Sequence, residues 1–296
     1  MHGAKGAKPE RTVDSCEQPE TCCPIKEIFY RYDGPNVVFR FDEILQKYVN
    51  IAAKDTPFAA LRDELGRTTS VCACDVDGDG KDEIYFHNEN DIYVDQIIQP
   101  DRMFRWTNNS YVDVFTYDVN KPVAPRFGGH AVGCLDRRGT GQYGVLVMTY
   151  SEYGEGRIVL IEVDFSHPDN NLDTGSLILK NSAPEVGLNT DRDGRSVAVG
   201  PILSENGHTD IIIANAASYY RGSYYIRHSG NNTIFKNVDG MFEEMSADDT
   251  WDSCGDSRGV FLTDLNNDGK MDIGIVDWLG THKLFIQNAD DSSLKV

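Results

Sequence analysis

The sequence lacks any long apolar run, since no stretch approaches the roughly 20 consecutive apolar residues that a membrane-spanning helix needs. It also has few basic residues, with 28 Lys and Arg against 47 Asp and Glu and a formal net charge of −19. Nucleic-acid binding needs a basic surface, so we exclude nucleic acid as a partner. The acidity instead suits cations, basic protein surfaces or a well-solvated exterior.

The first 26 residues lack the apolar core of a signal peptide, and they match nothing later in the chain. They are rich in Pro, Glu, Lys and Gly, so we expect residues 1–26 to be a disordered or divergent segment. Two N-glycosylation sequons, which begin at Asn108 and Asn231, are nevertheless compatible with secretion.

Cysteines number seven, and they lack the spacing of a zinc site, because Cys72-Ala73-Cys74 has no second pair to complete four ligands. Disulfides in an oxidising compartment are compatible with this pattern, but the sequence does not assign the partners.

Enzyme signatures are scarce. The seven histidines are dispersed, and there is no glycine-rich phosphate loop. The stretch Gly255–Gly259 matches the G-x-S-x-G pattern, but a nucleophile elbow needs a strand, a turn and a helix around Ser257. The residues after Ser257 form a small-residue and apolar run typical of a strand, so we predict that the chain is not an enzyme.

Sustained helical periodicity is almost absent as well. Its nearest case is residues 43–53, whose second half fits a strand better. The sequence instead contains a repeat, in which an anchor residue opens a turn-rich loop and an apolar run comes next. The intervals are about 60 residues, a period that marks repeat architectures. The anchors are Asp75, Asp136, Pro201 and Asp264, and the apolar runs are Ile84–Phe86, Val145–Met148, Ile211–Ala214 and Ile273–Val276.

Each repeat predicts four short antiparallel strands, which is the composition of a β-propeller blade. The first strand precedes the loop, as in Ser70–Cys74 and Gly259–Thr263, and the apolar run is the second. We expect third strands at Met103–Trp106, Ile158–Val163, Thr233–Asn237 and Lys283–Asn288, and fourth strands at Tyr111–Phe115 and Met241–Met245. The fold class is therefore all-β.

Two of the loops have the composition of calcium sites. Alternate acidic residues turn inward in a tight loop, glycine permits the turn, and hard oxygen ligands favour calcium over magnesium. The expected ligands of the first loop are Asp75, Asp77, Asp79, the backbone carbonyl of Lys81, and Glu83. Those of the second are Asp264, Asn266, Asp268, the backbone carbonyl of Lys270, and Asp272.

The alternatives to a calcium loop differ in strength. An EF-hand is excluded, because position twelve would be Phe86 or Ile275, inside a strand. An Asx-rich turn without metal stays open. For the copy at Asp136 that metal-free turn is the better interpretation, because arginines follow the anchor; the copy at Pro201 retains no ligand series.

These loops resemble the FG-GAP/VCBS repeats of integrin-α-type propellers. More closely, Asn36–Asp55, Ala60–Asp63 and Cys72–Phe86 are similar to the cartilage acidic protein family, as are Cys134–Tyr143 and Gly194–Ser204. The resemblance covers about residues 27–288. It implies a secreted, acidic, calcium-binding matrix glycoprotein with a seven-bladed propeller.

By this resemblance, residues 27–290 form a partial propeller with about three whole and two partial blades, and residues 291–296 are a tail. Such a chain is a fragment, a divergent short form or a truncated gene model. The expected function is non-enzymatic binding of an extracellular or cell-surface protein, for which the tyrosine-rich stretch Ser218–Arg227 is a candidate surface unless it packs on a blade. The alternative is a propeller that binds or acts on polysaccharide.

Overall fold

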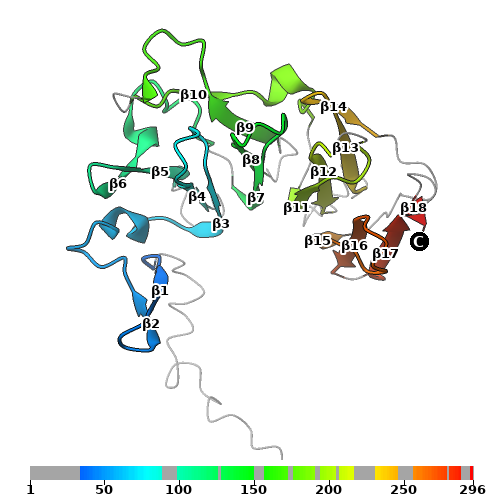
Figure 1. Cartoon of the computed structure of the whole chain (residues 1–296), viewed down its shortest axis with the longest axis horizontal. Helices are drawn as coiled ribbons and strands as arrows, with labels where there is room; N and C mark the ends of the chain where they lie inside the picture. Colours follow the sequence, from blue (N-terminus) through cyan, green and yellow to red (C-terminus); the bar gives the residue numbers. More distant parts are fainter. Residues whose placement is uncertain are drawn as a thin grey trace, which may run out of the picture.

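The structure is a computed structural model that describes residues 34–88, 99–125, 128–149, 157–172, 176–190, 194–204, 207–216, 231–245, 256–278, 280–287 and 294–295. Within these residues, one two-stranded and four four-stranded antiparallel sheets follow one another along the chain. We call the four-stranded sheets blades A to D. They lie side by side in an open arc, with the first strand of each blade toward the inside (Figure 1).

Each blade is a meander whose strands pair in chain order. A hairpin of β1 (Phe39–Asp42) and β2 (Lys47–Asn50) precedes them. Blade A consists of β3 (Thr68–Cys74), β4 (Glu83–Asn88), β5 (Arg102–Thr107) and β6 (Ser110–Asp113). Blade B consists of β7 (Gly129–Leu135), β8 (Gly144–Thr149), β9 (Ile158–Val163) and β10 (Leu179–Asn181). Blade C consists of β11 (Gly194–Gly200), β12 (Asp210–Asn215), β13 (Thr233–Val238) and β14 (Met241–Glu244). Blade D consists of β15 (Ser257–Thr263), β16 (Asp272–Asp277), β17 (Lys283–Gln287) and β18 (Leu294–Lys295).

The second strands of the inner blades are apolar on both faces because each packs between two neighbours. In β8, Val145 and Val147 belong to a core shared with blade A, whereas Leu146 and Met148 belong to a core shared with blade C. All four are at most 1% exposed. Burial on both faces explains why the sequence here is a continuous apolar run rather than an alternating one.

Strand β12 repeats this arrangement one blade further along. Ile211 and Ile213 face blade B, and Ile212 packs with Ile273 and Phe285 of blade D. At the end of the arc, the other face of blade D is uncovered among the described residues. Its Phe261, Val276 and Leu284 are 42%, 39% and 50% exposed, respectively.

The blades share a backbone irregularity that the sequence did not reveal. In each one, the pairing of strands one and two shifts register at the second residue of strand one. The four residues at this bulge are Thr69, His130, Arg195 and Arg258. A bulge increases the local twist of a strand pair, so the same twist is introduced at the same place in every blade.

A side-chain amide crosses each of the three boundaries between blades. In every case it donates to the backbone carbonyl of the residue that follows the loop anchor of the preceding blade. The three bonds join Gln142 Nε2 to Val76 O (3.2 Å), Asn237 Nδ2 to Arg137 O (2.9 Å) and Gln287 Nε2 to Ile202 O (2.6 Å). We call this recurring contact the amide clasp.

The structure confirms the all-β, propeller-like fold of four-stranded blades, and most expected strands lie where the repeat placed them. The expected blade count of three whole and two partial blades differs by one strand, since four blades are whole and the hairpin alone is partial. Leu294 and Lys295 lie in the predicted tail, yet they form β18 and pair with Gln287 and Ile286, which completes blade D. Two residues are too short to leave a sequence pattern.

The fourth strand of blade A is also shorter than expected. It ends at Asp113, and Val114–Thr116 form a 3-10 turn in which the Asp113 side chain accepts the Phe115 N–H. The described helices are all short 3-10 turns of this kind, so none of them could span a bilayer. The predicted segment 1–26 and the stretch Ser218–Arg227 lie outside the described residues.

The amide clasp predicts a stability defect at Asn237. Besides donating to Arg137 O, this side chain donates to Thr209 O (3.1 Å) and accepts the Gly240 N–H (2.8 Å), and the residue is 3% exposed. Asn237→Leu leaves three backbone groups without these bonds, so we expect the free energy of unfolding to fall by about 2–4 kcal/mol in urea. Val238→Ala, one residue along and 40% exposed, serves as the control. A loss for Asn237→Leu no larger than that of the control would contradict the clasp.

Candidate metal-binding loops

Each acidic loop connects strand one to strand two of its blade. We call residues 75–83 loop A, 136–144 loop B, 201–210 loop C and 264–272 loop D. The loops emerge at the same end of their blades, because strand one leads into each of them in the same direction.

Loop A brings three of its predicted ligands together. A carboxylate oxygen from each of Asp75, Asp77 and Asp79 lies within 4.8 Å of the others. Asp75 accepts the N–H groups of Gly78 (2.8 Å) and Gly80 (2.9 Å), and both glycines have positive φ. The loop backbone is thereby folded around the three carboxylates.

Loop D has the same frame. Asp264 accepts the N–H groups of Asp268 (3.1 Å) and Gly269 (2.9 Å), and Asp268 accepts that of Lys270 (2.9 Å). The side chain of Asn266 accepts the Asp268 N–H and donates its amide to the Asp268 carboxylate, each at 3.0 Å. The three residues predicted at positions one, three and five therefore lie together in this loop too.

The anchor aspartate forms this frame even where no ligand series remains. In loop B, Asp136 accepts the N–H groups of Thr140 (3.1 Å) and Gly141 (2.6 Å), the same two positions that Asp264 holds in loop D. The anchor carboxylate is thus a loop-folding group in its own right. This separates the shape of the loop from its capacity to hold a cation.

The carboxylate that opens strand two has a further role that the sequence did not predict. Glu83 is 1% exposed, and its Oε2 accepts the N–H groups of Val76 (2.9 Å) and Asp77 (3.4 Å). Asp272 is fully buried and accepts from Leu265 and Gln287. Both residues are therefore backbone caps as well as predicted ligands, and Glu83 lies outside the three-carboxylate group of loop A.

Loop C retains this cap although it has lost the ligands. Asp210 accepts the N–H groups of Ile202, Leu203 and Ser204, and also that of Asn237 in strand three. Because the same role recurs in three blades, with and without a ligand series, the cap is a property of the fold and not of a metal.

Burial, reinforced by neighbouring carboxylates, raises the pKa of two carboxylates in loop A. Burial raises the pKa of Glu83 to about 8, and the nearby charge of Asp77 adds to this effect. Burial also raises the pKa of Asp77, while Arg105 opposes the shift and Asp79 reinforces it. A cation among these carboxylates would relieve the repulsion.

Asp77 Oδ2 is a candidate oxygen ligand for a cation. This atom is buried and accepts no well-aligned hydrogen bond, although Nη2 of Arg105 lies 2.5 Å away. Clustered carboxylates are hard oxygen donors of the kind that calcium takes, so the residues of loop A fit the ion. Lys81 contributes a contact of its own, since its Nζ lies 3.3 Å from Asp79 Oδ2.

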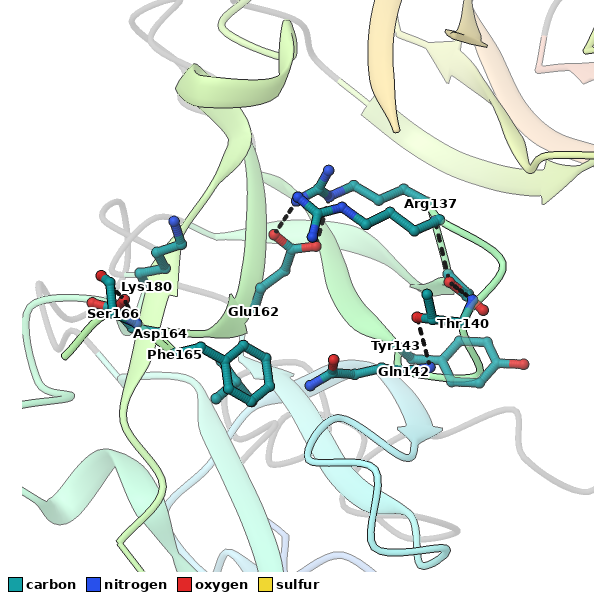
Figure 2. A pocket seen from close by; sticks show the side chains of 12 residues that line it. Arg137, Thr140, Gln142, Tyr143, Glu162, Asp164, Phe165, Ser166 and Lys180 are labelled. Carbon is teal, nitrogen blue, oxygen red and sulfur yellow. Dashed lines mark hydrogen bonds and ion pairs between the residues drawn. The ribbon is translucent and has the colours of Figure 1, made fainter. Parts of the chain in front are cut away.

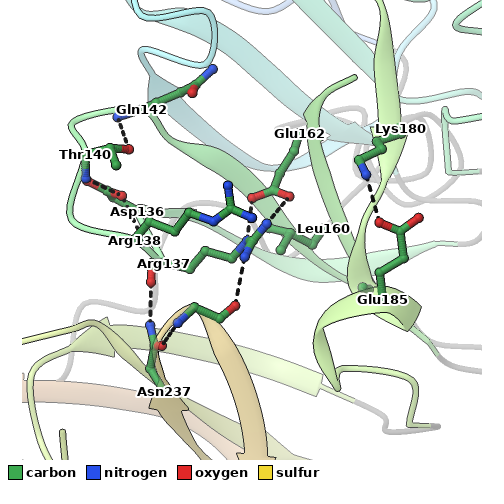
Figure 3. A network of polar contacts seen from close by, with 12 residues as sticks. Asp136, Arg137, Arg138, Thr140, Gln142, Leu160, Glu162, Lys180, Glu185 and Asn237 are labelled. Carbon is green, nitrogen blue, oxygen red and sulfur yellow. Dashed lines mark hydrogen bonds and ion pairs between the residues drawn. The ribbon is translucent and has the colours of Figure 1, made fainter. Parts of the chain in front are cut away.

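In loop B the positive charge comes from an arginine side chain instead of a metal ion. Arg137 forms a two-point ion pair with Glu162 of β9 (2.7 and 3.1 Å) and donates to Gly240 O in blade C (2.8 Å). Figure 3 shows this side chain reaching across the boundary, beside the clasp from Asn237. Gly144 opens strand two here, and a Cβ at that position would lie 2.9 Å from Glu162 Cγ, so glycine leaves room for the pair.

A pocket of about 360 Å³ lies beside loop B, between it and the segment after β9. Figure 2 shows the Arg137–Glu162 pair in its wall, with Phe165 and Tyr143 nearby. Lys180 is bound to Glu185 at 2.7 Å, and Phe165 is 62% exposed. This pocket is where the alternative, a polysaccharide site, would be sought.

The structure also places the other candidates from the sequence, the serine of the G-x-S-x-G pattern and the two sequon asparagines. Ser257 lies at the start of β15, is fully buried and donates its hydroxyl to Asp277, so it is not on a nucleophile elbow. Asn108 lies exposed in the two-residue turn between β5 and β6, and Asn231 is half-buried just before β13. Both sequons remain predictions.

One disulfide joins blades A and B. Cys74 ends β3 and pairs with Cys134 of β7, with Cα atoms 5.7 Å apart. Cys72 lies close by, with its Sγ 3.7 Å from that of Cys74, and burial raises the pKa of its thiol to about 12. The bond therefore fastens the first strands immediately before loops A and B, and Cys72 is poorly ionised at neutral pH.

The disulfide predicts a large difference between cysteine variants. Its partners are 60 residues apart in the sequence, so the double variant Cys74→Ser, Cys134→Ser should lose about 2–5 kcal/mol in the free energy of unfolding. Cys72→Ser should lose much less and should leave the bond intact. Non-reducing peptide mapping together with urea unfolding measures both. A Cys72–Cys134 linkage in the map would refute the assignment.

No protein-family model matches the chain. Cartilage acidic protein 1 of Xenopus tropicalis is 38% identical over 265 residues, which cover 86% of this chain and 38% of that protein. The Homo sapiens protein of the same name is 38% identical over 262 residues, covering 86% of this chain and 37% of its own length. The chain thus spans less than half the length of the curated relatives it matches.

Among solved structures, the V. cholerae biofilm matrix protein Bap1 is similar at a TM-score of 0.32 and 12% identity, over 70% of this chain and 34% of that one. A likeness this low carries no argument. The sequence match is much stronger, because it joins 38% identity to coverage of most of the chain. Over 86% of its length, the chain is similar in sequence to cartilage acidic protein 1.

Proposed function

We propose that the chain is a non-enzymatic, calcium-stabilised extracellular propeller segment that binds protein partners. The observation that carries the proposal is the convergence of Asp75, Asp77 and Asp79 in loop A, with the same backbone frame in loop D. The ligands of loop A would be these three residues with Glu83 and the Lys81 carbonyl. Those of loop D would be Asp264, Asn266, Asp268, Asp272 and the Lys270 carbonyl.

The proposed extracellular location has two supports. The curated relatives bear a name that places an acidic protein in cartilage, an extracellular matrix, and this chain is itself acidic, with a formal net charge of −19. The Cys74–Cys134 disulfide suits an oxidising compartment. Extracellular calcium is also abundant enough to fill loops of modest affinity, for which dissociation constants are on the order of 10⁻⁴ to 10⁻³ M.

In such loops calcium would supply charge neutralisation. The chain's own residues do the rest: the anchor aspartates fold each loop, and Glu83 and Asp272 cap the backbone beneath it. Since loop B forms the anchor bonds although it has no ligand series, calcium would stabilise a formed loop rather than create one. The expected gain is about 1 kcal/mol per site when calcium is several-fold above its dissociation constant.

Single alanine variants test this proposal. Asp79→Ala and Asp268→Ala should each remove one bound calcium and that loop's share of the calcium-dependent rise in melting temperature. Calorimetric titration and melting curves with and without calcium measure the two effects. Calcium binding would be refuted if neither variant lost a bound ion, or if calcium did not raise the melting temperature of the wild-type protein.

Two control variants separate metal binding from loop folding. Asp136→Ala should leave the calcium-dependent rise unchanged, yet lower the melting temperature with and without calcium, because Asp136 accepts several loop N–H groups. Asp118→Ala removes a carboxylate that is 95% exposed and paired only with Lys121 among described contacts, so it should change neither quantity.

A further inference from the structure

The two calcium-type loops differ in the strand-three residue that faces them. Strand pairing aligns Phe104 with Ile84, Ile161 with Val145, Phe235 with Ile211, and Phe285 with Ile273. The next residue in each third strand therefore occupies one equivalent position. It is Arg105 in blade A, Glu162 in blade B, Lys236 in blade C and Ile286 in blade D.

In blades A and B this residue forms an ion pair with its own loop. Arg105 Nη2 lies 2.5 Å from Asp77 Oδ2, and the two side chains are 9% and 0% exposed. Glu162 holds Arg137 of loop B. The signs are reversed between the blades, but in each case a charge fixed in strand three balances one in the loop.

Blade D offers loop D no such charge, because the equivalent residue is Ile286. Its loop also presents a neutral Asn266 where loop A presents the charged Asp77. Loop A therefore combines one more carboxylate at position three with a buried internal cation that is already in contact with it. Removal of solvent from the Arg105–Asp77 pair makes this attraction stronger than a surface ion pair.

We propose that Arg105 is an internal cation that competes with calcium for Asp77, holding loop A partly neutralised without the metal and weakening its calcium affinity. A calcium ion bound to the same carboxylate would lie within a few ångströms of the guanidinium, and like charges at that separation repel. Arg105 is a positioning and tuning residue rather than a ligand. The inference rests on the proposed calcium binding of loop A.

The test measures calcium binding by loop A with loop D disabled. In an Asp268→Ala background, calorimetric titration measures calcium binding with Arg105, Arg105→Met and Arg105→Lys. Methionine retains much of the volume without the charge, so we expect it to tighten binding about fivefold to tenfold. Lysine retains the charge and should remain within about threefold of the parent.

A second readout follows stability. Without calcium, Arg105→Met should melt at a lower temperature than its parent, because Asp77 loses its buried counter-charge, and its calcium-dependent rise should be larger. Equal or weaker calcium affinity in the folded Arg105→Met protein would overturn the inference while leaving calcium binding intact. If the Asp268→Ala background binds no calcium with any residue at 105, calcium binding by loop A itself is refuted.

The converse variant keeps the test decisive if Arg105→Met fails to fold. The Asp79→Ala background disables loop A, so that calcium binding reports on loop D. In this background Ile286→Arg places a cation at the position equivalent to Arg105, and Ile286→Met is its matched control. We expect the arginine to weaken calcium binding about threefold or more relative to methionine. Equal affinities for these two variants would overturn the role assigned to this position.

Discussion

Packing of the second strands of the inner blades, each between two neighbouring blades, is the constraint on which the rest of the structure depends. Val145 and Val147 need blade A, and Leu146 and Met148 need blade C, so β8 has no solvent-facing side. A single blade could not bury such a strand, and cooperative stability must therefore extend along the arc. The apolar side chains that remain exposed on blade D are of the same kind as those buried at the three inner boundaries.

This packing leaves a polar problem at the loop end of each boundary, where backbone groups approach the core. Three kinds of side chain contribute to solving it. An anchor carboxylate folds loops A, B and D, and a carboxylate at the start of strand two caps loops A, C and D. At all three boundaries an amide from the next blade satisfies the carbonyl after the anchor. Because these contacts occur in loops with and without a ligand series, the shape of the loop is a property of the fold and does not depend on that series.

Much of this was predictable from the sequence because the repeat is written in local patterns. Apolar runs identified the second strands, and alternate acids identified loops A and D. The predicted ligands Asp75, Asp77 and Asp79 do converge, whereas Glu83 lies apart from them as a cap. The cap was hidden because a carboxylate at that position has the same appearance in sequence whether it faces a metal or a backbone N–H.

Contacts between blades were the part that sequence could not provide. Cys72 and Cys74 are two residues apart on one strand, and nothing in the spacing chooses which of them pairs with Cys134. The amide clasp uses Gln142 from a loop at one boundary, but Asn237 and Gln287 from third strands at the others. The same carbonyl is satisfied from different places, so no motif of fixed spacing records the contact.

Loop chemistry in this fold is therefore set by pairs of positions rather than by the loop alone. Charge in the same space is balanced in two ways. In blade A an arginine of strand three, Arg105, faces the loop carboxylate of Asp77, and in blade B a carboxylate of strand three, Glu162, faces the loop arginine Arg137. The second needs no metal, and its arginine also bonds to the next blade. Loop B, which lacks the acid series, thus keeps its place in the arc through an arginine that pairs with strand three of its own blade and bonds to the next blade.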